Sequence, residues 1–101
     1  MSLPKLVRDK IPEIIKESGH EPQMHRAMPK EFSNLLIEKM KEELAEFEEN
    51  PCLDEAADIY EVFLAILDNW GMSRDLLEMV AKSKRDIRGA FKKGIVLEKV
   101  L

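Results

Sequence analysis

Cysteine is nearly absent from this 101-residue sequence, and long apolar runs are missing. A single cysteine, Cys52, excludes an intrachain disulfide and a cysteine-based zinc cluster, which is typical of a reducing compartment. No apolar run approaches the roughly 20 residues of a membrane helix, and the opening segment MSLPKLVRDK lacks the apolar region of a signal peptide. We therefore expect a cytoplasmic protein that makes no use of a membrane.

Glycine and proline are also scarce, with four and five residues, and the stretches between them have apolar residues at helical spacing. The pattern predicts an all-α fold, an antiparallel bundle of about four helices within a single domain that spans residues 1–101. The helices are expected at about residues 6–19, 30–49, 53–70 and 74–88.

Three residues near the expected helix starts refine these boundaries. Pro12 is compatible with the first helix only if the helix proper begins near it, because proline is tolerated in a first turn but not in a helix interior. Asp54 is a candidate cap for the third helix, and Ser73 is the expected N-cap of the fourth.

The net charge of −4 conceals a division along the chain. Residues 38–61 hold ten acidic and two basic side chains, a balance of −8, whereas residues 82–99 hold seven basic and two acidic side chains, a balance of +5. This layout argues against a nucleic-acid-binding surface over the whole protein. It suits a cation and a polyanion bound side by side.

The second expected helix separates its acidic residues into two groups. At about 100° per residue, its apolar face consists of Leu36, Met40, Leu44 and Phe47, with Ser33 beside them. Glu43 lies at the margin of this face and Glu46 just beyond it, one turn further on. The rest are expected to be surface charges: Glu42, Glu48 and Glu49.

The third expected helix turns two further carboxylates toward packed surface. One apolar side contains Ala57, Tyr60, Leu64 and Leu67. Glu55 and Asp58 lie away from the polar strip of this helix, on the side of a second apolar surface. Burial of unpaired carboxylates costs several kcal/mol each, and no basic residue lies nearby in sequence. A bound divalent cation would offset this cost.

The donor types indicate which cation to expect. The ExxE pair Glu43 and Glu46 and the ExxD pair Glu55 and Asp58 would converge if the turn at Asn50 and Pro51 makes the two helices antiparallel. Four oxygen donors suit Mg²⁺, or Mn²⁺ as an alternative. Helical di-iron sites use a Glu-x-x-His pair, and this sequence contains none.

These residues resemble a known family. The EExxE pattern at residues 42–46, followed by ExxD at residues 55–58, is similar to the signature of the all-α nucleoside triphosphate pyrophosphohydrolases, the MazG-like group that includes dimeric dUTPases and phosphoribosyl-ATP pyrophosphohydrolase. The flanking segments KLVRDKIPEII and KSKRDIRGAFKKGIVL are similar to those of its small single-domain branch. The resemblance thus covers nearly the whole chain.

The resemblance implies Mg²⁺-dependent hydrolysis of a nucleoside triphosphate between its α and β phosphates, giving the monophosphate and pyrophosphate. It implies that Glu42 or Glu43 orients or deprotonates the attacking water. Phosphate-binding candidates are the basic residues of the last helix and of the N-terminal segment: Lys82, Arg85, Arg88, Arg8 and Lys10. Housecleaning of noncanonical nucleotides is the usual suggestion for this branch.

Two alternatives accompany this prediction. One is phosphoribosyl-ATP pyrophosphohydrolase activity in histidine biosynthesis, and the other is a non-catalytic helical module that binds a partner through its acidic residues. Since the second and third helices are apolar on more than one side, we also expect a homodimer, or an oligomer built from dimers, to complete the four-helix core.

Overall fold

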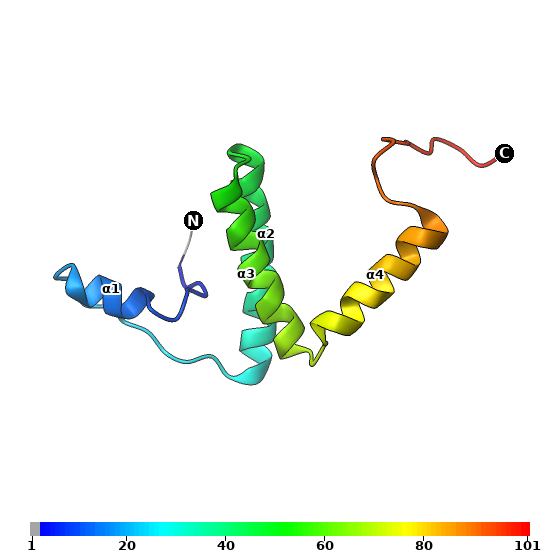
Figure 1. Ribbon diagram of the computed structural model, residues 1–101. Helices are drawn as coiled ribbons and strands as arrows, with labels where there is room; N and C mark the ends of the chain where they lie inside the picture. Colours follow the sequence, from blue (N-terminus) through cyan, green and yellow to red (C-terminus); the bar gives the residue numbers. More distant parts are fainter. Residues whose placement is uncertain (1–2) are drawn as a thin grey trace. The chain divides into compact units, whose positions relative to one another are not determined.

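The computed structural model describes residues 3–101, which form four α-helices and no strand (Figure 1). The helices are α1 (Ile11–Glu17), α2 (Pro29–Glu49), α3 (Leu53–Asn69) and α4 (Arg74–Arg88). The predicted all-α class is therefore confirmed. None of these helices combines the length and apolarity needed to cross a bilayer. The chain divides into two compact units, one ending at Trp70 and the other comprising Gly71–Leu101.

Helix α1 is much shorter than the sequence predicted. It begins at Ile11, so that Pro12 occupies the first turn, where its missing N–H group leaves no hydrogen bond unmade. It ends at Glu17, and Gly19 follows with a φ of +89°, a conformation that favours glycine. Residues 3–10 instead form an irregular segment that runs into the helix.

Helices α2 and α3 lie side by side as an antiparallel hairpin (Figure 1). Their bounds agree with the predicted ones to within a residue. Asn50 ends α2 and Cys52 is the N-cap of α3, so the connection is a tight turn around Pro51. The predicted cap role of Asp54 is wrong, because Asp54 lies inside the first turn of α3 and no side chain caps this helix.

The interior of the hairpin is small. Leu36 of α2 and Leu67 of α3 are 1% and 4% exposed, and they are the buried apolar side chains among residues 3–101. At the end of the hairpin away from the turn, the Asn69 amide donates a 2.9 Å hydrogen bond to the Ser33 hydroxyl. These contacts hold the two helices in register, with the acidic segment at the turn end.

The hairpin leaves apolar side chains uncovered. Leu44 and Tyr60, both expected on apolar faces, are 51% and 59% exposed, and Trp70 at the end of α3 is 45% exposed. Apolar surface of this kind marks a region suited to packing against another chain.

The second unit consists of α4 and the residues after it. The Ser73 hydroxyl accepts a hydrogen bond from the N–H of Leu76, which confirms its predicted role as N-cap. Gly89, with a φ of +85°, ends the helix at the predicted position.

Candidate metal centre

Three carboxylates meet between α2 and α3 near the turn. Glu43 of α2 is 5% exposed, and Glu55 and Asp58 of α3 are half-buried. One carboxylate oxygen from each of the three lies within 4.8 Å of the other two. The antiparallel hairpin thus brings the ExxD pair of α3 against Glu43, as the helical projection predicted.

A second acidic triad shares Glu43. Carboxylate oxygens of Glu42, Glu43 and Glu46 also lie within 4.8 Å of one another, all on α2. Glu46 is exposed, unlike Glu43. The four predicted ligands therefore belong to two overlapping triads, with Glu43 common to both, rather than to one group of four.

Two carboxylate oxygens in this region are buried without a hydrogen-bond partner, Oε2 of Glu43 and Oε2 of Glu55. Burial raises the pKa of Glu43, and the neighbouring Lys39 opposes that rise. Burial also raises the pKa of Glu55, and the negative charges of Asp58, Asp54 and Glu43 add to it. Both carboxylates are therefore harder to keep ionised than in water, mainly because they are buried.

Lys39 is a functional candidate that the sequence analysis missed. Its ammonium lies 3.2 Å from Oε1 of Glu43 and 3.2 Å from Oε2 of Glu42. The signal was present, because lysine three and four residues before two glutamates on a helix is positioned to contact both.

Glu42 is more buried than predicted, since it was expected to be a surface charge. Its side chain is only 13% exposed, and besides Lys39 it has Lys5 of the N-terminal segment at 3.7 Å. The other two predicted surface carboxylates, Glu48 and Glu49, are indeed exposed. Packing of the N-terminal segment beside α2 explains the difference, since a helical projection contains no information about other segments.

Arg8 reaches the triad of Glu43, Glu55 and Asp58 from the N-terminal segment. Its guanidinium donates a 2.6 Å hydrogen bond to Oδ1 of Asp58, and its side chain is 55% exposed. This position suits the predicted phosphate-binding residue, because an exposed guanidinium beside a candidate metal ligand can exchange one anionic partner for another.

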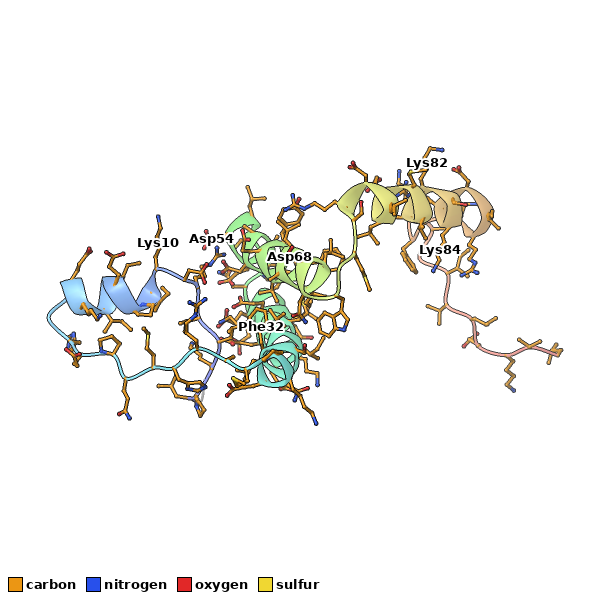
Figure 2. The ribbon with its side chains drawn as sticks, turned by 90° about the horizontal axis from the view of Figure 1, so that it is seen from below. Lys10, Phe32, Asp54, Asp68, Lys82 and Lys84 are labelled. Atoms are coloured by element: carbon orange, nitrogen blue, oxygen red, sulfur yellow. The ribbon has the colours of Figure 1, made fainter. Side chains whose placement is uncertain are left out.

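An open groove adjoins the cluster. It has a volume of about 640 Å³ and lies between the N-terminal segment and the hairpin. Its apolar lining includes Phe32, near the start of α2 in Figure 2, and Leu36 and Val62. Glu43 and Asp58 line the same groove, as does Lys10, another predicted phosphate-binding residue. The groove therefore places apolar surface and basic groups next to the acidic cluster.

The remaining phosphate-binding candidates belong to the second unit, within α4. Lys82 forms an ion pair with Asp86 at 3.0 Å, and Arg85 lies 4.0 Å from Glu78, whereas Arg88 ends the helix. Lys82 and Lys84 project from opposite sides of α4 (Figure 2). Their predicted phosphate contacts stay a prediction.

Comparison with protein families, curated proteins and solved structures finds no match for this chain. The family resemblance accordingly rests on the motif residues themselves.

The donor set fits a hard divalent cation. All candidate ligands are carboxylate oxygens, and the two unpartnered oxygens lie on Glu43 and Glu55, which share a triad with Asp58. Mg²⁺ and Mn²⁺ prefer such ligands, and a cation there would satisfy both oxygens. The triad of Glu43, Glu55 and Asp58 is thus the better candidate site.

Proposed function

We infer that this chain is a Mg²⁺-dependent nucleoside triphosphate pyrophosphohydrolase, with Mn²⁺ as an alternative metal. The observation that supports this most is the buried carboxylate of Glu43, which is 5% exposed. Its Oε2 has no hydrogen-bond partner, and it shares a triad with two carboxylates of the next helix. Isolated buried charge is costly, so an arrangement of this kind is typical of a site that a cation completes.

Under this proposal, the acidic residues either bind the metal or activate water. Glu43, Glu55 and Asp58 hold the metal, and Glu46 is a further ligand candidate from the overlapping triad. When bound, the metal neutralises triphosphate charge and makes a water molecule more acidic. Glu42 or Glu43 orients or deprotonates the attacking water.

Basic residues would bind the phosphates. Arg8 and Lys10 line the groove beside the acidic cluster, and the α4 residues Lys82, Arg85 and Arg88 are additional candidates. Guanidinium and ammonium groups stabilise the charge that develops on the phosphate oxygens during hydrolysis. The apolar part of the groove would cover the nucleoside.

The exposed apolar faces of α2 and α3 support the second part of the proposal, a homodimer or dimer-based oligomer. We also propose that the protein is cytoplasmic and that it removes noncanonical nucleotides.

The decisive experiment measures pyrophosphate release from a panel of nucleoside triphosphates, with phosphoribosyl-ATP included, in Mg²⁺ or Mn²⁺. Glu43→Gln and Asp58→Asn should each lower turnover by about 100-fold, because even the loss of a residue that only orients a metal ligand costs about 10- to 100-fold. Glu48→Gln is the matched control, because Glu48 lies on the same helix but is exposed. Equal turnover by all three variants would refute the site, and preference for phosphoribosyl-ATP would favour the biosynthetic activity.

A non-catalytic helical module is the second candidate. It is favoured by the two cations already present, since Lys39 and Arg8 neutralise part of the acidic cluster without any metal. This alternative predicts that Mg²⁺ neither raises the melting temperature nor supports hydrolysis of any substrate in the panel.

A further inference from the structure

The two oxygens of the Glu43 carboxylate have different surroundings. Oε1 lies 3.2 Å from the Lys39 ammonium, whereas Oε2 is buried with no hydrogen-bond partner. The Lys39 ammonium also lies 3.2 Å from Oε2 of Glu42, so it bridges two members of the α2 triad. One side of Glu43 is therefore already neutralised and the other is not.

We propose that the Lys39 ammonium takes the place of a second cation in the Glu42, Glu43 and Glu46 triad, so that each chain binds one divalent ion, at Glu43, Glu55 and Asp58. The inference rests on the proposed function, in that it assumes a metal at Glu43, Glu55 and Asp58. It specifies how many ions that site takes and which residue limits the number.

Coulomb repulsion provides the reason. A divalent ion bound to Glu42 and Glu43 would share two carboxylates that the ammonium already contacts, which places two positive centres within a few ångströms of each other. Such repulsion is strong where water is scarce, and Glu43 and Lys39 are both largely buried, with side chains 7% and 15% exposed. The triad on α2 thus has a resident cation, and the triad between the helices has room for one.

Arg8 does not have the same effect on the other triad. Its ion pair is with the single carboxylate of Asp58 among residues 3–101, its side chain is 55% exposed, and it lies outside the four helices. Arg8 can leave Asp58 for solvent or for a phosphate at little cost, because exposed ion pairs stabilise weakly. Lys39 is fixed on the central part of α2, and its departure would leave the buried Glu43 without a counter-charge.

The test counts bound Mn²⁺ by electron paramagnetic resonance during titration of the full chain. The wild type should bind one Mn²⁺ per chain. Lys39→Met should bind two, and Lys39→Arg, which keeps the charge, should bind one. Lys41→Met is the matched control: it removes the same charge from the same helix, but Lys41 is exposed and pairs with Glu38 at 3.4 Å, away from the cluster, so it should bind one.

The outcomes separate this inference from the proposed function. A wild type that binds no Mn²⁺ contradicts both. A wild type that binds two ions, or a folded Lys39→Met variant that binds only one, overturns the role of Lys39 and leaves the metal site standing. Circular dichroism checks the helix content of each variant, and if Lys39→Met does not fold, the wild-type stoichiometry and a Lys39→Gln variant decide the question by the same criteria.

Discussion

Glu43 carries its charge at a position that water barely reaches, 5% exposed between two helices. A buried carboxylate is tolerated when counter-charges and hydrogen bonds compensate for its lost hydration. Here Lys39 provides compensation for one oxygen only. In the absence of metal, the charge of Glu43 should therefore oppose folding.

The pH dependence of stability tests whether the charge of Glu43 opposes folding. Burial raises its pKa in the folded chain above the ordinary 4.5, so the folded state holds this proton more tightly than the unfolded state does. The contribution of Glu43 to stability is therefore greatest at acidic pH and falls as pH rises from 4.5 through the raised value. The melting temperatures of wild type and Glu43→Gln should be measured without divalent ions from pH 4 to 8. The melting temperature of the wild type should fall relative to that of the variant as pH rises.

Glu48→Gln again serves as the comparison, because Glu48 lies on the same helix and its side chain is exposed. A wild type that gains stability over Glu43→Gln toward pH 8 would show that Lys39 overcompensates the buried charge.

Arg8 should affect metal affinity without much effect on stability. Its contact with Asp58 is partly exposed, and such pairs contribute about 0–1 kcal/mol. Arg8→Ala removes a cation that competes with metal for Asp58, so the Mn²⁺ dissociation constant should fall several-fold while KM for a triphosphate rises. Arg26→Ala, in the exposed loop before α2, controls for the change of net charge. Weaker Mn²⁺ binding by Arg8→Ala would contradict this competition.

At the scale of elements, the α2–α3 hairpin depends on few buried side chains. Leu36 is 1% exposed, so Leu36→Ala should lower the free energy of unfolding by about 2–5 kcal/mol, from lost transfer energy and the cavity left behind. Its neighbour Ile37 is 41% exposed and Ile37→Ala should cost much less. Urea denaturation followed by circular dichroism measures both, and equal losses would mean that Leu36 is not central to the packing.

Local chemistry explains why three of the four helices were predictable. Pro51, between α2 and α3, and Ser73 and Gly89, at the two ends of α4, each act on the backbone within one turn of a helix end, so their effect is visible without knowledge of the fold. The start of α1 was misplaced because residues 6–10, which have helical spacing, belong to an irregular segment that contacts α2 through Lys5 and α3 through Arg8.

The candidate site was predictable to the extent that it lies on single helices. The helical projection predicted that Glu43, Glu55 and Asp58 face inward, and the structure places them together. Lys39 was visible in the same helix and was overlooked. Arg8 was a phosphate-binding candidate, but its contact with Asp58, fifty positions away along the chain, could not have been predicted, because only tertiary packing brings the two together.

At the scale of the whole molecule, the exposed apolar side chains lead to a prediction about assembly. Leu44, Tyr60 and Trp70 of the first unit are each more than 40% exposed. Covering them would add apolar burial at about 25 cal/mol per Å², which a chain with so few buried residues would gain from. Light scattering after size exclusion at micromolar concentration should give twice the chain mass or a higher even multiple. Tyr60→Lys should shift the distribution toward monomer, and a monodisperse wild-type monomer would contradict the dimer.

The candidate ligands Glu43, Glu55 and Asp58 all lie within residues 43–58, on either side of one short turn. Closing so short a loop costs little entropy, and contacts this local form early when a chain folds. A divalent ion can therefore bind as soon as the two helices meet, before the remaining contacts are made. If so, Mg²⁺ should increase the refolding rate in stopped-flow experiments, and the ion would act on the folding pathway as well as on the finished protein.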